Sequence, residues 1–233
     1  MFSFLNPKKN ILEANVLAGM TDVHCHLLPG VDDGVANLEE AHRALDFMES
    51  LGVRRIFLTP HIMEDIPNPT ARLRERFAEL LAAYKGNVVL NLAAENMLDK
   101  LFEERLEQGD LLPLGKDGRH LLVETSYFNP PMGLDDILRR IQAKGYYPLL
   151  AHPERYIYME ENDYVRLKSM HIKFQLNLFS LMDLYGKEVR KRAKELQSKG
   201  MYDYIGTDLH RIAVLNNLLE KRNPSDSWRL LGE

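Results

Sequence analysis

The sequence predicts an α/β fold in which parallel strands alternate with helices, either doubly wound or closed into a barrel. Short apolar runs alternate with longer segments of helical period about seven times, which is typical of a parallel sheet. Nearly every predicted strand also ends in a histidine or a carboxylate, and functional side chains gather at the carboxyl ends of such strands. Residues 1–233, of which 45% are hydrophobic, suit one large domain with a sizeable core.

Seven short segments are predicted to be strands because they are apolar and rich in β-branched or aromatic residues. In chain order they are residues 16–24, 55–61, 88–94, 121–125, 147–152, 172–177 and 204–207. Residues 111–123 interrupt this rhythm, because "LLPLGKDGRHLL" carries a turn signal at "KDG". That signal predicts a small hairpin.

Six segments between these strands have the period and the end signals of helices. The first follows Asn37, a good N-cap residue, and ends before Gly52. In the second, Leu73, Phe77 and Leu80 recur at helical spacing. The predicted helices are residues 38–51, 70–84, 135–143, 162–170, 187–198 and 209–221.

The composition argues against several classes of protein. A net charge of −4 and a pI near 6.1 give no global attraction to nucleic acid or to anionic membranes. We expect no signal peptide and no transmembrane segment, and the single cysteine, Cys25, is typical of a reducing compartment. We therefore expect a cytoplasmic protein. "MFSFL" beside Lys8 and Lys9 could touch a membrane surface, but a docked or frayed terminus is favoured.

Metal-ligand residue types close six of the seven predicted strands. They are His24, His26, His61, Glu95, Glu124, His152, Asp208 and His210. Because strand side chains alternate, the His-x-His pair directs both imidazoles to one face and Cys25 to the other. Each residue alone has an ordinary structural explanation, but packing does not explain the whole set.

Together with Asp33, these side chains have the composition of a polynuclear metal site. Mixed nitrogen and oxygen ligands favour manganese, iron or zinc over calcium. At roughly four to six ligands per ion, the set suits two or three ions. We expect structural or surface roles for His42, His120 and His171, which lie in or beside predicted helices and turns. Cys25 lacks the following arginine of a cysteine phosphatase and is interpreted as a small buried hydrophobe.

The same residues lie in motifs that resemble the PHP (polymerase and histidinol phosphatase) superfamily. The motifs are "DVHCHLLPGVDDG", "LTPHI", "AAE", "LLVETSY", "LLAHPERY" and "IGTDLH", and they run from Asp22 to His210. More narrowly, they resemble the manganese-dependent bacterial tyrosine-protein phosphatases of capsular and exopolysaccharide synthesis. The resemblance implies a distorted seven-stranded β/α (TIM-like) barrel of the PHP type, holding three metal ions.

The resemblance also implies a set of ligands for each ion. One ion would take His24, His26, Glu95 and Asp208; the second would share Glu95 and add Glu124 and His152; the third would take Asp33, His61 and His210. Arg155 of "HPER" would hold the phosphate, and the leaving group would take its proton from Asp208 or from water. Arg211 is the one basic residue directly after "IGTDLH", where the family would have more. Arg211 is therefore the one candidate for a second phosphate-binding arginine.

By resemblance, the expected function is hydrolysis of phosphotyrosine on a protein, namely a membrane-bound tyrosine autokinase of polysaccharide synthesis. Two alternatives remain: a small-molecule phosphatase such as histidinol-phosphatase, and a non-catalytic regulatory module. A nuclease is disfavoured by the acidic pI. Aromatic residues in segments 126–134 and 155–160 serve either as a substrate platform or as ordinary loop packing.

Overall fold

The structure, a computed structural model, describes residues 7–115, 117–224 and 228. Parallel strands form a three-stranded sheet in the order β2-β3-β5 and a six-stranded sheet in the order β10-β9-β8-β7-β6-β4. The strands are β2 (Thr21–Cys25), β3 (Arg55–Leu58), β4 (His61–Ile62), β5 (Val89–Leu92), β6 (Glu95–Met97), β7 (His120–Glu124), β8 (Tyr147–Ala151), β9 (Lys173–Asn177) and β10 (Tyr204–Gly206).

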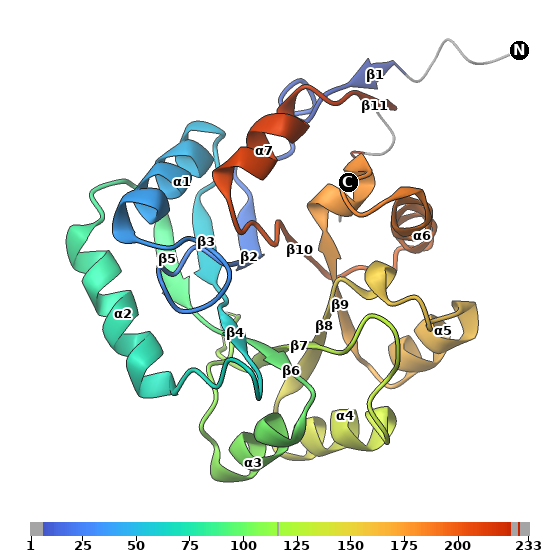
Figure 1. Ribbon diagram of the computed structural model, residues 1–233. Coiled ribbons are helices and arrows are strands. Elements are labelled where there is room, and N and C mark those ends of the chain that lie inside the picture. Colours follow the sequence, from blue (N-terminus) through green and yellow to red (C-terminus); the bar gives the residue numbers. More distant parts are fainter. Residues whose placement is uncertain (1–6, 116, 225–227, 229–233) are drawn as a thin grey trace, which may run out of the picture.

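The helices form an outer ring around the strands (Figure 1). They are α1 (Leu38–Ser50), α2 (Thr70–Ala83), α3 (Lys100–Gln108), α4 (Leu134–Ala143), α5 (Glu161–Ser169), α6 (Lys187–Ser198) and α7 (Ile212–Leu219). Two short 3₁₀ helices, η1 (Pro153–Arg155) and η2 (Leu178–Met182), follow β8 and β9. As the sequence predicts, the Asn37 side chain caps α1 by accepting a hydrogen bond from the Glu40 amide. Within the described residues, no helix combines the length and apolarity needed to cross a membrane.

The α/β class is confirmed, and the strands curl into a half-barrel made of two sheets. The predicted strand 55–61 is divided, because β3 stops before Pro60 and the chain pairs again as β4. The predicted strand 88–94 is shortened to β5, and β6 follows it as a separate strand. Pro60 has no amide hydrogen for the ladder, yet its carbonyl accepts a hydrogen bond from the Glu95 amide at 3.1 Å. On the other side, a single parallel bridge between Cys25 and Leu209 joins β2 to the segment after β10.

Several parts of the chain differ from the sequence prediction. Residues 16–20 form turns rather than strand, because backbone amides in this segment donate to carbonyls a few residues earlier in the chain. For example, the Val16 amide donates to the Ile11 carbonyl at 3.4 Å. Helix α3 was not predicted, because its sequence "KLFEERLEQ" is mostly polar and buries only Phe102, Arg105 and Leu106. The last helix is shorter than residues 209–221.

The predicted hairpin at residues 111–123 is reduced to a single antiparallel bridge. Leu114 and His120 exchange two backbone hydrogen bonds of 2.8 and 3.0 Å, while His120 itself begins the parallel strand β7. Lys116, the first residue of the "KDG" turn signal, lies outside the described residues.

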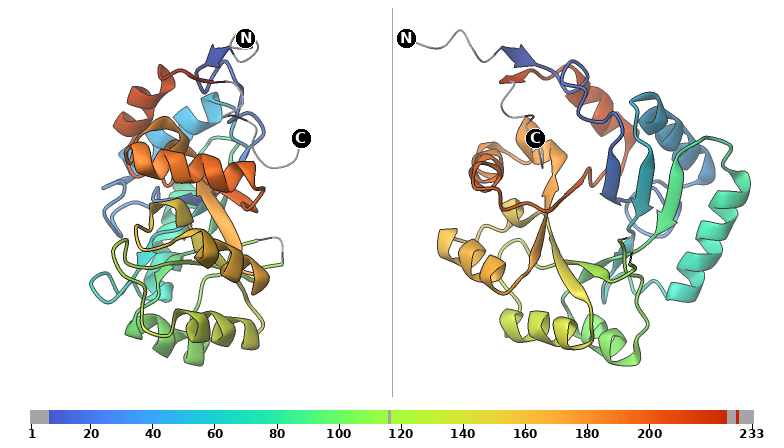
Figure 2. Two further views of the ribbon diagram at one scale, coloured as in Figure 1. Left: turned by 90° about the vertical axis from the view of Figure 1, so that its right-hand side faces the viewer. Right: turned by 180° about the vertical axis from the view of Figure 1, so that it is seen from behind.

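The two ends of the described chain lie side by side. Strand β1 (Lys8–Lys9) pairs antiparallel with β11 (Asn223–Pro224), as both views in Figure 2 show. The Trp228 indole donates a hydrogen bond to the Lys9 carbonyl at 3.1 Å. The segment "MFSFL", for which a docked or frayed terminus was favoured, lies outside the described residues.

A buried aspartate fastens β2 to the end of β10. Asp22 accepts hydrogen bonds from the Thr207 amide at 2.9 Å and the Thr207 hydroxyl at 2.5 Å. It also accepts one from the His24 amide at 3.2 Å. Burial raises the pKa of Asp22 to about 6, although these donors favour the carboxylate.

We expect Thr207→Val to lower the free energy of unfolding of the metal-free protein by about 2 kcal/mol, because a buried carboxylate loses a hydroxyl donor. Urea unfolding followed by circular dichroism measures this change. Thr21→Val, at the exposed start of β2, is the matched control and should stay within about 0.5 kcal/mol of wild type. Equal stability of the two variants would contradict the role given to Thr207.

Candidate metal centre

A cavity of about 500 Å³ lies at the carboxyl ends of the strands. Loops and short helices that follow the strands supply its walls. It is lined by Asp33, His61, Glu95, Tyr127, His152, Arg155, Tyr185, Asp208, His210, Arg211 and Val214. His24, His26 and Glu124 are buried beneath it, within the same clusters of ligand-type atoms.

The first cluster consists of His24, His26, Glu95 and Asp208, all buried. The Nε2 atom of His24 lies 3.1 Å from Glu95 Oε2 and 3.4 Å from Asp208 Oδ1. The Nε2 atom of His26 lies 3.3 Å from each of the same two oxygens. The two imidazoles of the His-x-His pair thus face the same carboxylates, and these four residues are the set that the resemblance implies for one ion.

The second cluster consists of His61, Glu95 and Glu124. The Nδ1 atom of His61 lies 3.2 Å from Glu95 Oε2 and 3.1 Å from Glu124 Oε1. His152, which the resemblance places with these two glutamates, instead has its Nε2 atom 3.1 Å from the other oxygen of Glu95. The structure therefore groups His61 with the two glutamates, while His152 contacts Glu95 through the other carboxylate oxygen.

The third cluster consists of His26, Asp33, His61 and His210. Asp33 Oδ1 lies 3.4 Å from His210 Nε2 and 3.7 Å from His61 Nε2. The rings of His26 and His210 stack, with centroids 3.9 Å apart. His26 is thus an addition to the expected set, and it links this cluster to the first.

The electrostatics of the clusters fit divalent cations. Among the described residues, His61 Nδ1, Glu95 Oε2 and Glu124 Oε1 are buried without a hydrogen-bond partner, although they lie close together. Burial opposes the charged form, but Glu95 and Asp208 raise the pKa of His24 to about 9. Burial and the neighbouring Glu95 raise the pKa of Glu124. Carboxylates packed this closely need positive charge between them, and imidazole and carboxylate groups are suitable ligands for it.

Two residues outside the predicted ligand set orient the His-x-His pair. Asp32 Oδ2 lies 2.8 Å from His26 Nδ1, and Gln175 Oε1 lies 3.0 Å from His24 Nδ1. Partners of this kind fix the ring orientation and leave the other nitrogen for a metal. The adjacent acid in "VDDG" pointed to Asp32, whereas Gln175 ends no strand and had no signal in the sequence.

The backbone is unusual where two of the ligand-type residues project. His152 has φ of 32° and Asp208 has φ of 52°, in the left-handed region that residues other than glycine rarely adopt. Just before Asp208, a Cβ atom at Gly206 would lie 2.5 Å from the His24 Cβ, so only glycine fits there. Such local strain is typical of functional sites.

Arg155 projects into the same cavity from η1. Its Nη1 atom donates to Asp208 Oδ2 at 2.6 Å, and its guanidinium lies 4.6 Å from the centroid of Tyr127 and 4.2 Å from that of Tyr185. The side-chain amide of Asn177 donates to the same Asp208 oxygen at 3.0 Å and to the Tyr185 hydroxyl at 3.1 Å. Arg155 is therefore held in place next to the clusters, with Tyr127 and Tyr185 as contacts that the sequence did not reveal.

Arg211 lines the cavity but is exposed at the start of α7. Helix α7 has the sequence "IAVLNNLL" and contains no lysine or arginine. Arg211 is thus the basic residue that this segment brings to the cavity, as its position in the sequence suggested.

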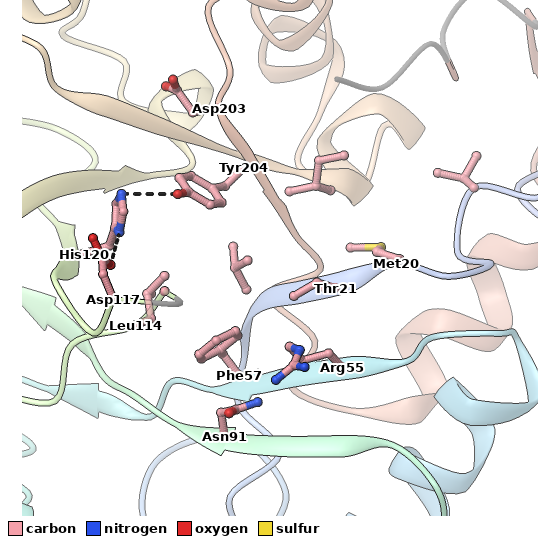
Figure 3. A pocket seen from close by; sticks show the side chains of 14 residues that line it. Met20, Thr21, Arg55, Phe57, Asn91, Leu114, Asp117, His120, Asp203 and Tyr204 are labelled. Atoms are coloured by element: carbon pink, nitrogen blue, oxygen red, sulfur yellow. Dashed lines mark hydrogen bonds and ion pairs between the residues drawn. The ribbon is translucent and has the colours of Figure 1, made fainter. Parts of the chain in front are cut away.

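A larger cavity, of about 920 Å³, lies at the opposite, amino ends of the strands (Figure 3). His120 lies there and pairs with the Tyr204 hydroxyl at 3.2 Å. None of the ligand-type clusters found in the described residues touches this cavity, so it is not the candidate metal centre. His42, in α1, and the exposed His171 also lie outside these clusters. Cys25 is fully buried in the core, as expected of a small hydrophobe.

The chain is similar to bacterial tyrosine-protein phosphatases. The tyrosine-protein phosphatase YwqE of Bacillus subtilis is 27% identical over 203 residues, which cover 84% of this chain and 80% of that protein. The tyrosine-protein phosphatase CpsB of Streptococcus pneumoniae is 28% identical over 217 residues, covering 83% and 84%. A crystal structure from a study of these two metal-dependent tyrosine phosphatases superposes with a TM-score of 0.75 at 25% identity, covering 83% of this chain and 80% of that one.

A family model describes the same region of the chain. The model for capsular polysaccharide synthesis proteins CpsB/CapC matches residues 20–223, which include every ligand-type residue of the three clusters. Because the match extends over most of its length, the chain belongs to the CpsB/CapC family of capsular polysaccharide synthesis proteins.

Proposed function

We propose that the chain is a metal-dependent tyrosine-protein phosphatase, which hydrolyses phosphotyrosine in a protein substrate. The observation that carries this proposal is one cavity in which three clusters of ligand-type atoms lie next to a partly buried arginine, Arg155. The names of the relatives YwqE and CpsB support the same activity.

Manganese is the proposed metal, bound as two or three ions, with iron or zinc as other candidates of the same ligand preference. The residues that would hold the ions are His24, His26, Asp33, His61, Glu95, Glu124, His152, Asp208 and His210. Divalent ions supply positive charge to the phosphate and lower the pKa of water so that it can attack phosphorus. Burial and Arg155 lower the pKa of His152 to about 4, so its imidazole is neutral and available as a ligand at pH 7.

The proposed role of Arg155 is to bind two oxygens of the phosphate, which a planar guanidinium does well. Tyr127 and Tyr185 hold the guanidinium in place, and Arg211 at the cavity rim is the proposed second phosphate contact. Burial opposes ionisation of Asp208, but His24 and His26 hold its pKa well below the usual range. Asp208 is then a ligand rather than a proton donor, and water is the proposed acid for the phenolate, whose pKa of ~10 makes it a fair leaving group.

The proposed substrate is a membrane-bound tyrosine autokinase of polysaccharide synthesis, reached from the cytoplasm. The family's description as capsular polysaccharide synthesis proteins supports this pathway, and the lone cysteine fits a reducing compartment. We propose further that residues 1–233 act as one domain. The Cys25–Leu209 bridge supports a distorted seven-stranded barrel of the PHP type as its architecture.

The test is hydrolysis by the purified protein of a phosphotyrosine peptide, the same peptide with phosphoserine, and histidinol phosphate. Each substrate is assayed with manganese and with a chelator. We expect manganese-dependent phosphate release from the phosphotyrosine peptide alone, because phenolate leaves more readily than alkoxide. Release from histidinol phosphate alone would identify a small-molecule phosphatase, and no release from any substrate by metal-loaded protein would favour a regulatory module.

A further inference from the structure

The three most exposed large apolar side chains of the described chain lie in two segments that also contribute Tyr127 and Arg155 to the wall of the candidate metal centre. Met132 is 98% exposed, Phe128 67% and Ile157 57%. Phe128 and Met132 lie between β7 and α4, and Ile157 lies between η1 and α5. Both loops leave the carboxyl ends of strands that also supply Glu124 and His152. We call these three residues the apolar ridge.

The loops that carry the apolar ridge are fixed to each other. The Ile157 amide donates to the Tyr127 carbonyl at 2.9 Å. Tyr156 is fully buried and stacks between Tyr127 and Tyr158, with centroids 6.1 and 5.7 Å away. Tyr158 in turn shares a 2.6 Å hydrogen bond with the Thr125 hydroxyl. The tyrosines therefore pack the two loops against each other, which is the loop-packing role of the two alternatives that the sequence left open. The apolar ridge remains exposed on this support.

The apolar ridge is continuous with the cavity through the chain itself. Tyr127 lines the cavity and contacts the Arg155 guanidinium, and Phe128 is the next residue. A phosphotyrosine that is part of a protein must bring its neighbouring residues against the surface around the cavity. A cluster of exposed apolar side chains at that place indicates a contact surface rather than the scattered apolar residues of any protein surface.

We propose that Phe128, Met132 and Ile157 bind apolar side chains that flank the phosphotyrosine in the substrate polypeptide. The inference rests on the proposed phosphatase function and specifies the substrate further. A peptide is favoured over a membrane surface because the ridge is joined to the cavity wall: Phe128 follows Tyr127, which contacts the Arg155 guanidinium. The neighbouring carboxylates Asp135, Asp136, Glu161 and Asp163 are paired with arginine or lysine, so these segments offer no excess of positive charge to anionic lipids.

The test compares the manganese-loaded wild type with the triple variant Phe128→Ser, Met132→Ser, Ile157→Ser. The substrates are p-nitrophenyl phosphate, a phosphotyrosine peptide with flanking leucines, and the same peptide with flanking serines. We expect the triple variant to lose about tenfold in kcat/KM on the leucine peptide, mainly through KM, and to keep its activity on p-nitrophenyl phosphate. The double variant Leu12→Ser, Leu81→Ser removes two other exposed leucines. It should retain its activity on p-nitrophenyl phosphate and on the leucine peptide.

Each alternative result overturns the inference in a recognisable way. Equal losses on p-nitrophenyl phosphate and on the leucine peptide would mean that the ridge stabilises the cavity and does not bind the peptide. Unchanged kinetics would mean that it does neither. Co-sedimentation with phosphatidylcholine–phosphatidylglycerol vesicles that the triple variant loses, without a change in peptide kinetics, would identify a membrane surface instead. A wild type inactive on p-nitrophenyl phosphate and on both peptides would refute the proposed function itself.

Discussion

Glu95→Gln is expected to abolish binding of divalent ions at the first two strand-end clusters and to lower kcat/KM on a phosphotyrosine peptide by about 10³-fold. Glu95 belongs to two of the three clusters, and its Oε2 atom lies within 3.3 Å of ring nitrogens of His24, His26 and His61. Glutamine preserves the size of the side chain but supplies one weaker oxygen and no charge. The first two clusters therefore lose the carboxylate that they share.

Metal content by elemental analysis, measured beside steady-state kinetics, checks this expectation. Glu104→Gln, on the surface of α3, is the matched control and should change neither quantity. Circular dichroism on the Glu95→Gln protein should match wild type, since the substitution is isosteric. A variant that retained its full metal content would remove Glu95 from the site.

Arg155→Lys is expected to leave the metal content unchanged and to lower kcat/KM by about 10²-fold, mainly through a higher KM. Lysine keeps the charge, but it can neither bind two phosphate oxygens in a fixed plane nor stack in the same way on Tyr127 and Tyr185. The effect therefore separates the geometry of the guanidinium from its charge.

The control for this substitution is Arg119→Lys. Arg119 also lies over a tyrosine ring, 4.8 Å from the centroid of Tyr147, but at the amino end of the strands. Kinetic constants of that variant should match those of wild type. Loss of metal on changing Arg155, or full activity, would contradict the role proposed for this residue.

The positions of the candidate site follow from a simple sequence rule. Apolar strands that end in histidine or a carboxylate place those residues at the same, carboxyl end of neighbouring parallel strands, as His24, Glu124 and His152 illustrate. The rule does not depend on exact strand boundaries. It held even though the first strand begins at Thr21, several residues later than the sequence suggested.

The contacts that orient the site residues could not be predicted from the sequence in this way. Gln175 reaches His24 from the middle of β9, and Tyr185 reaches Arg155 from a loop after η2, so both contacts depend on tertiary structure. The closeness of His61 to Glu124 also arises only where β4, β6 and β7 lie side by side. The division into two sheets follows from Pro60, whose missing amide hydrogen interrupts the ladder.

The most direct test of the central claim is a metal titration of chelator-treated protein. Manganese is added in steps while hydrolysis of a phosphotyrosine peptide and the amount of bound metal are followed together. We expect no hydrolysis without metal, and activity that rises as two or three ions bind per chain. Full hydrolysis by metal-depleted protein would contradict the claim that these clusters carry the reaction through bound metal.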